Sequence, residues 1–171
     1  MGRLRAVGSR GAPDRLRGAP SRLLNRTATL ASRLVADGFG AVGARRYHYW
    51  LLAALEQFGP ATQAELGRRA GLDRSDVVAT VNELAGKGCV ERAPDPDDRR
   101  RNVVSLTRVG LAHLRELDGV QAAAQDALLA PLSAAERAEP VRVLGVVLEH
   151  RGRIRRKVLL VGCRSGRVPF V

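Results

Sequence analysis

Residues 62–107 read TQAELGRRAGLDRSDVVATVNELAGKGCVERAPDPDDRRRNVVSLT, and this stretch decides the fold. Two short helical patterns come first, and two strand patterns joined by a polar, arginine-rich turn follow them. This order predicts a helix-turn-helix followed by a β-hairpin wing. In such a unit the second helix enters the major groove of DNA.

Both helices of this unit carry recognisable start and stop signals. Thr62 and Glu65 have the spacing of a capping box, in which a hydroxyl and a carboxylate satisfy free amides at the helix start. Gly71 is free to adopt a positive φ and is expected to end the first helix. Asp73 is expected to cap the second helix through its carboxylate. The turn between the helices is therefore predicted at residues 71–73.

The second helix is predicted to have one buried and one exposed face. Apolar or small residues recur at a helical spacing on the buried side, and they are Val77, Val81, Leu84 and Gly88. The other side offers small, polar or methyl-bearing groups, which suit contact with base edges. We therefore predict a recognition helix whose DNA-binding residues are Arg74, Ser75, Asp76, Val78, Ala79 and Asn82. Three roles remain open for Asp76. It could accept a hydrogen bond from a cytosine amino group, orient Arg74, or only stabilise the start of the helix.

The wing is predicted from two strands, 89–92 and 102–106, around a turn at 95–101. Proline and aspartate favour the turn, and it contains no apolar residue that requires burial. Three arginines at its tip, Arg99, Arg100 and Arg101, are predicted to contact phosphates or a narrow minor groove. An arginine run is also typical of a solvated loop, so this assignment depends on the helices before it.

Residues 62–110 resemble the winged helix of the MarR family, the multiple antibiotic resistance regulators. The specific part is the Asp98-Arg99-Arg100 tip leading into Leu106-Thr107-Arg108-Val109-Gly110, which matches the family's Asp-x-Arg and Leu-Thr-x-x-Gly pattern. Residues 84–92 resemble its Leu-x-x-x-Gly-Leu-Val-x-Arg segment, with Cys89 where leucine is usual. The resemblance covers about residues 25–151. It implies a homodimeric regulator, usually a repressor, that binds a pseudo-palindromic operator in double-stranded DNA.

The resemblance also gives the remaining helices a role. The expected fold class is mostly α, with a winged helix-turn-helix at 59–106 and a two-stranded β-wing. The helices at 21–58 and 107–151 are expected to form the dimer. Ser21 is expected to cap a helix that runs to about Ala41 and that glycines 38, 40 and 43 close. Thr107 is expected to cap a helix at 107–129. Ser133 and Glu136 form a second capping box for a helix at 133–150, which Pro140 is expected to kink. Residues 1–20 are predicted to be a disordered basic arm, and 152–171 a basic tail.

An aromatic cluster opens the helix predicted at 45–57. In proteins of this family the corresponding helix lines a crevice where small aromatic or phenolic effectors bind, so Tyr47, His48 and Trp50 are candidate effector contacts. The alternative is that Trp50 and one tyrosine only fill the junction between two parts of the fold. The family's peroxide sensors use a reactive cysteine near the N-terminal helices. This sequence has no cysteine there, and Cys89 is expected to be a buried apolar residue.

The composition restricts the function less than the motif does. Of the net charge of +12, residues 1–20 supply +4 and residues 152–171 supply +6, so 21–151 carry only +2. Basicity alone is therefore no argument for DNA binding. No metal-ligand spacing, catalytic constellation or membrane-length apolar span is present in the sequence, so we expect no cofactor, no metal, no enzyme and a cytoplasmic location. A winged-helix protein–protein module without DNA binding remains the alternative.

Overall fold

The computed structural model describes residues 13–95 and 102–162, the last twelve of these by their backbone alone. The predicted tip arginines at 99–101, and most of the predicted arm and tail, lie outside the described residues. The chain forms two compact units, 1–128 and 129–171, and each is described by itself.

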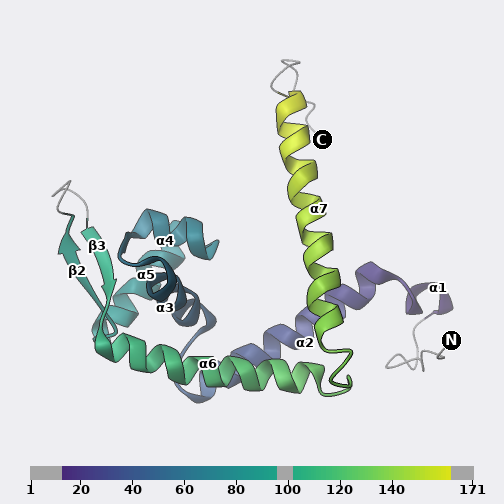
Figure 1. Cartoon of the computed structure of the whole chain (residues 1–171), viewed down its shortest axis with the longest axis horizontal. Helices are drawn as coiled ribbons and strands as arrows, with labels where there is room; N and C mark the ends of the chain where they lie inside the picture. Colours follow the sequence, from purple (N-terminus) through teal and green to yellow (C-terminus); the bar gives the residue numbers. More distant parts are fainter. Residues whose placement is uncertain (1–12, 96–101, 163–171) are drawn as a thin grey trace. The chain divides into compact units, whose positions relative to one another are not determined.

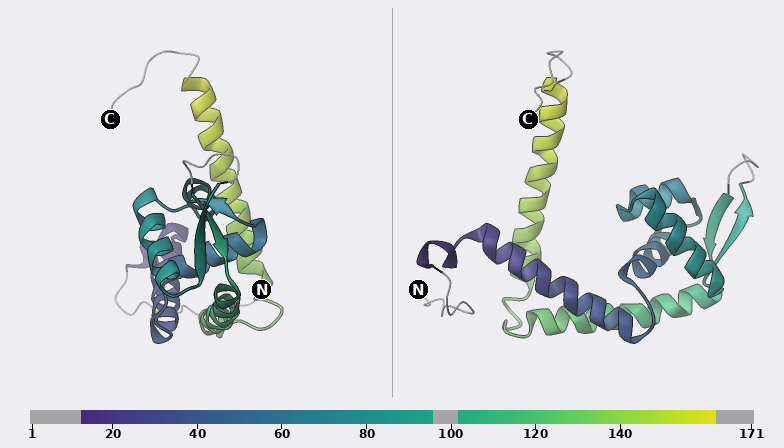
Figure 2. Two further views of the ribbon diagram at one scale, coloured as in Figure 1. Left: turned by 90° about the vertical axis from the view of Figure 1, so that its left-hand side faces the viewer. Right: turned by 180° about the vertical axis from the view of Figure 1, so that it is seen from behind.

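The first unit contains a helix-turn-helix, a small sheet and flanking helices (Figure 1). Its elements are α1 (Asp14–Arg17), α2 (Pro20–Ala41), α3 (Arg46–Phe58), β1 (Ala61–Thr62), α4 (Gln63–Ala70), α5 (Arg74–Gly86), β2 (Val90–Pro94), β3 (Asn102–Leu106) and α6 (Arg108–Leu129). The order of α4, α5, β2 and β3 confirms the predicted winged helix-turn-helix. Figure 2 shows the hairpin of β2 and β3 rising from the start of α6, beside α3, α4 and α5.

The sheet has three antiparallel strands in the order β1-β3-β2, where the sequence predicted two. In addition to the hairpin, Ala61 and Thr62 pair with Val104 and Val103. A two-residue strand leaves no periodic pattern, which is why the sequence did not reveal it. The pairing attaches the start of the helix-turn-helix to β3, the central strand of the sheet.

The helix-turn-helix forms largely as its signals predict. The Thr62 hydroxyl accepts from the Glu65 amide at 3.3 Å, and the Glu65 carboxylate accepts from the Thr62 amide at 2.9 Å, so the capping box is confirmed. Gly71 ends α4 with φ of 65°. Asp73 occupies the cap position of α5, but its carboxylate makes no capping hydrogen bond, contrary to prediction. Gly67 allows the two helices to approach closely, because an added Cβ would lie 3.2 Å from the Leu72 carbonyl oxygen.

The core of this unit lies between α3, α4, α5, the sheet and α6. Its fully buried side chains include Leu51, Leu52, Leu66, Val77, Val81, Leu84, Val104 and Leu117. Gly88, predicted on the buried face of the second helix, instead lies beyond the end of α5 with φ of 68°. Cys89 precedes β2 rather than belonging to it, but its predicted burial is confirmed. Burial raises the pKa of its thiol, which keeps the sulfur protonated.

Thr107 attaches α6 to the turn between α5 and β2. Its hydroxyl accepts from the Gly110 amide at 3.0 Å, which confirms the predicted cap. The same hydroxyl lies within hydrogen-bond distance of two carbonyl oxygens, those of Gly88 at 2.7 Å and Cys89 at 3.1 Å. The Thr107 amide also donates to Cys89. The start of α6 is therefore fixed against the segment that follows the recognition helix.

The N-terminal helix differs from its prediction at its start. It starts at Pro20, with Ala19 at the cap position, so Ser21 lies inside the helix. Proline is well suited to the first helical position because it lacks an amide that would be unpaired there. The helix ends at Ala41, as predicted, and it continues through two of the three glycines that were expected to close it. The short α1 also places a helical turn in the stretch predicted to be disordered.

The second unit consists mainly of α7 (Ala138–Gly162). The Ser133 amide donates to the Glu136 carboxylate, which is half of the predicted capping box. The Ser133 hydroxyl also donates to that carboxylate, the Glu136 amide donates to the Ser133 carbonyl, and the helix begins only at Ala138. Pro140 therefore lies in its first turn, where the amide would have no helical partner, and the predicted kink has no cause. The helix also extends beyond the predicted end at residue 150. Among the described residues, no helix is both long and apolar enough to cross a membrane.

Candidate nucleic-acid interface

The two faces of α5 divide as predicted. Val77, Thr80, Val81 and Leu84 are buried, and they fix the helix to the core. Thr80 was missed because a threonine hydroxyl does not register as an apolar position. Of the predicted DNA contacts, Arg74, Ser75, Val78, Ala79 and Asn82 are exposed, and Asp76 is half-buried. The helix thus offers a row of short side chains to solvent, which is what close approach to a major groove requires.

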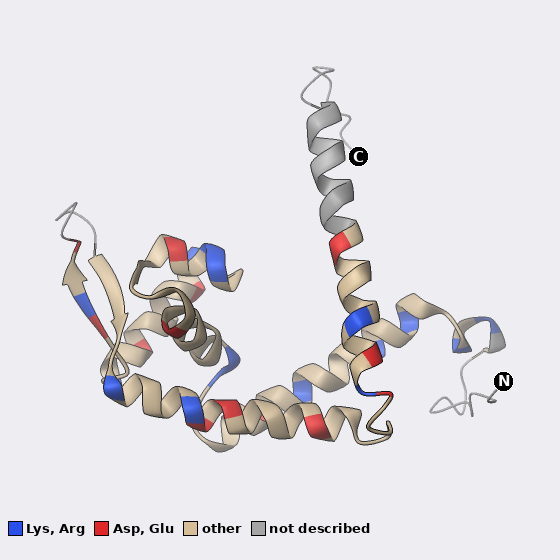
Figure 3. Ribbon diagram, in the orientation of Figure 1, with Lys and Arg blue, Asp and Glu red and all other residues tan. Residues whose placement is uncertain are grey.

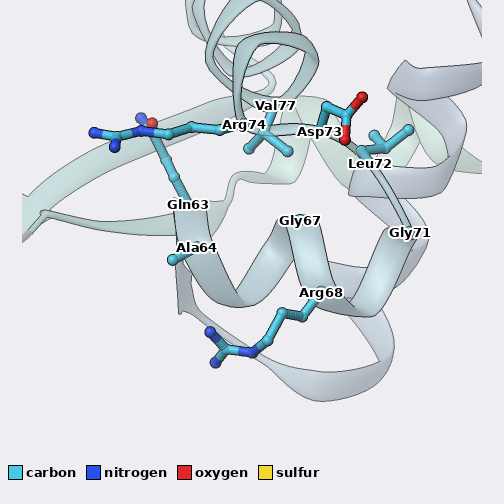
Figure 4. A pocket seen from close by; sticks show the side chains of 9 residues that line it. All are labelled: Gln63, Ala64, Gly67, Arg68, Gly71, Leu72, Asp73, Arg74 and Val77. Atoms are coloured by element: carbon cyan, nitrogen blue, oxygen red, sulfur yellow. The ribbon is translucent and has the colours of Figure 1, made fainter. Parts of the chain in front are cut away.

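A shallow depression of about 650 Å³ lies at the turn between α4 and α5 (Figure 4). Gln63 at the start of α4 and Arg74 at the start of α5 extend their side chains toward one another, whereas Arg68 points away from them. The N-terminal ends of both helices therefore lie at this depression. Exposed backbone amides at a helix start favour anions such as phosphate.

One wing residue contacts the recognition helix directly. The guanidinium of Arg92, on β2, donates to the side-chain oxygen of Asn82, on α5. Both side chains are exposed. Their pairing was not predicted, because it joins a helix to a strand across a turn.

The buried His48 forms a second connection to the recognition helix, at the residue that follows Asn82. Its Nδ1 accepts from the Arg45 amide at 3.2 Å, and its Nε2 lies 2.8 Å from Glu83, on α5. Since an accepting Nδ1 carries no proton, Nε2 must be the donor, and both nitrogens are satisfied only in the neutral ring. Burial accordingly lowers the pKa of His48, although the hydrogen bond with Glu83 opposes the shift. Hydrogen bonds from His48 and Arg45 lower the pKa of Glu83.

The other predicted effector residues lie apart from His48. Tyr47 is half-buried and Trp50 is 41% exposed; their rings lie with centroids 5.5 Å apart and are tilted by 44° to one another. The guanidinium of Arg46 lies over both rings, at 5.0 and 5.6 Å from their centroids. The structure thus brings Tyr47 and Trp50 together on the surface, while the side chain of His48 is engaged inside the unit. Tyr49, between them in sequence, donates to Asp118 and connects α3 with α6.

Charges of both signs are mixed over the described surface. Figure 3 shows basic and acidic residues interspersed along α4, β2 and α6. Within residues 13–95 and 102–162, the helix-turn-helix therefore has no uniformly basic face. In the same ranges, no group of three or more His, Cys, Asp or Glu residues is arranged to hold a metal ion.

Comparison with known proteins identifies related regulators. Residues 44–101 match the model of the MarR family. The chain is 34% identical over 86 residues to the HTH-type transcriptional repressor NicR of Pseudomonas putida, a match covering 50% of this chain and 54% of NicR, so it spans only about half of that relative. The PcaV transcriptional regulator of Streptomyces coelicolor, solved in complex with its natural ligand, is 30% identical, with a TM-score of 0.65 and coverage of 81% of this chain and 96% of PcaV. A mutant of E. coli MarR complexed with operator DNA is 25% identical, with a TM-score of 0.65 and coverage of 75% and 92%.

Proposed function

The chain belongs to the MarR family of transcriptional regulators, and from this premise we propose that it is a sequence-specific DNA-binding repressor that binds a pseudo-palindromic operator as a homodimer. NicR is a repressor, and the MarR mutant was solved on operator DNA, so both relatives support this proposal. Because a regulator of this kind acts on the chromosome, we assign it to the cytoplasm.

The division of α5 into two faces is the observation that carries the proposal. Its buried face packs the helix against the core, and its exposed face presents Ser75, Ala79 and Asn82, which base edges can approach. We assign base contacts to Arg74, Ser75 and Asn82, with methyl contacts from Val78 and Ala79. Asp76, which is half-buried in the first turn, either accepts from a cytosine or orients Arg74.

The wing supplies the contacts outside the major groove. β2 and β3 lead directly into the segment that contains Arg99, Arg100 and Arg101. We assign these arginines to phosphate or minor-groove contacts, which would hold the recognition helix in register.

The exposed apolar side chains of the flanking helices support a homodimer. On α2, Leu23, Leu24 and Leu30 are each between 42 and 52% exposed. On α7, exposed apolar side chains occur at Val141, Val143, Leu144, Val146, Val147 and Leu148. Together, the exposed apolar side chains of α2 and α7 form more apolar surface than a monomeric protein normally exposes to water. We therefore assign residues 21–58 and 107–151 to dimerisation and 59–106 to DNA binding.

A small aromatic effector is a further part of the proposal. PcaV was solved with its natural ligand, which supports ligand control in a relative of this chain. We assign the effector to the half-buried ring of Tyr47 and the exposed ring of Trp50, and His48 would respond indirectly through its bond to Glu83. An effector that favours one arrangement of α5 over another would shift the population of DNA-competent dimers.

Selection of bound duplexes from a random pool tests the function. We expect an enriched inverted repeat with half-sites about one helical turn apart, bound more tightly than random DNA and with strong salt dependence. A protein that retains no duplex at low salt would instead favour the protein–protein module, for which the nearly neutral charge of 21–151 is the supporting observation.

A further inference from the structure

The contact between Arg92 and Asn82 joins the wing to the middle of the recognition helix. Along β2 the side chains alternate between two faces, so Arg92 lies on the same face as the buried Val90. Its backbone pairs with Val104, which is also buried. The guanidinium therefore extends from the core side of the sheet to the exposed side of α5, where it reaches Asn82.

The chemistry of the two groups determines which way the Asn82 amide faces. A guanidinium has five N–H donors and no acceptor, so only the oxygen of a carboxamide can face it. Placing the Asn82 oxygen toward Arg92 turns the two amide hydrogens away from the wing. An exposed asparagine without such a neighbour exchanges freely between both orientations and can act as donor or acceptor.

We propose that Arg92 is a positioning residue for base recognition, which makes Asn82 present its NH₂ group to the DNA. This inference rests on the proposed function. Guanine, adenine and thymine each have an acceptor in the major groove, whereas cytosine offers only an amino donor. Asn82 can therefore donate to guanine, adenine or thymine, and it excludes cytosine from the position it contacts.

Relative affinities for a selected operator and its single-base variants test this assignment. Asn82→Ala identifies the base pair whose preference depends on Asn82. At that pair, Arg92→Ala should reduce the discrimination against cytosine by roughly fivefold or more, which is the scale of one base contact. In the Asn82→Ala background, the same Arg92 substitution should have no further effect on discrimination. Arg92→Lys should largely preserve it, because an ammonium group is also only a donor.

A second substitution tests the orientation of the amide directly. Asn82→Asp keeps an oxygen toward Arg92 but replaces the outward NH₂ group by a second oxygen. The variant should therefore accept from the cytosine amino group, and the preference at this one pair should reverse. Arg115→Ala, which removes an exposed arginine from α6, is the charge-matched control and should leave base preference unchanged.

The possible outcomes separate this inference from the proposed function. If Arg92→Ala weakens all duplexes equally and leaves the preference at the Asn82 pair intact, Arg92 contacts phosphate only and the inference is overturned. A wild-type protein that prefers cytosine at that pair would overturn it as well. If the wild-type protein shows no sequence preference at all, the proposed function itself fails.

Discussion

Gly110 provides the most direct test of how α6 is attached to the winged helix. A Cβ at this position would lie 2.0 Å from the carbonyl oxygen of Cys89 and 2.8 Å from Cδ1 of Leu106. Ordinary van der Waals contact begins at 3.4 Å, so in Gly110→Ala the start of α6 would have to retreat by about 1.4 Å from the Cys89 backbone.

This movement has a predictable effect on stability. Retreat stretches the hydrogen bonds that Thr107 makes with Gly88 and Cys89, each of which contributes about 0.5–1.5 kcal/mol. Overpacking a close contact destabilises the fold by about a further 1–3 kcal/mol. The better helix propensity of alanine stabilises it by about 1 kcal/mol. We expect Gly110→Ala to lower the free energy of unfolding by about 3 kcal/mol.

Gly119 is a matched control on the same helix. A Cβ there meets no atom within 4 Å, so Gly119→Ala should raise the free energy of unfolding by about 0.5–1 kcal/mol. Denaturant unfolding of both variants at one protein concentration measures the difference, because the stability of a dimer depends on concentration. A change of less than about 0.5 kcal/mol for Gly110→Ala would refute the close approach of α6 to Cys89.

The remaining predictions concern the wing, acid sensitivity and assembly. Replacing Arg99 and Arg100 by alanine should weaken binding to all duplexes and reduce the salt slope by about 0.9 for each phosphate that the wing no longer neutralises; an unchanged slope would show that the wing tip does not touch DNA. Because the pKa of His48 is lowered from 6.5, the unfolded chain takes up a proton that the folded chain does not, and the free energy of unfolding should fall as the pH drops below that value. Denaturant unfolding across this range should show a flatter pH slope for His48→Gln but not for the exposed control His150→Gln, and equal slopes in all three proteins would exclude His48 as the source. Leu144→Glu with Leu148→Glu, on α7, should convert a sedimenting dimer into monomer, whereas Glu139→Gln on the same helix should not; dimer retained in the double variant would exclude this face.

Local signals in the sequence predicted the helix-turn-helix well. Thr62 with Glu65 and the spacing of Val77, Val81 and Leu84 act within one or two helical turns, so they can be recognised without knowing the fold. The start of α7 shows the limit of such signals. Glu136 does accept from the Ser133 amide as predicted, but the helix begins five residues after Ser133, where Pro140 fits into its first turn.

The predicted site was less complete because its supporting contacts join distant parts of the chain. His48 was considered as an effector contact from its neighbours in sequence, yet its partner Glu83 is 35 residues away. Arg92 appeared only as part of a strand motif, and nothing in its own segment points to Asn82. These pairings arise only when α3, α5 and β2 pack around one core.

The position of β2 at the edge of the sheet has a consequence for solubility. In the order β1-β3-β2, one side of β2 has no neighbouring strand among the described residues. Such an edge can add a strand from another molecule and start aggregation. Pro94 interrupts the row of amides, and the adjacent charges of Glu91 and Arg92 disfavour the approach of a second strand. These features of β2 therefore disfavour its pairing with the β2 strand of another molecule at high protein concentration.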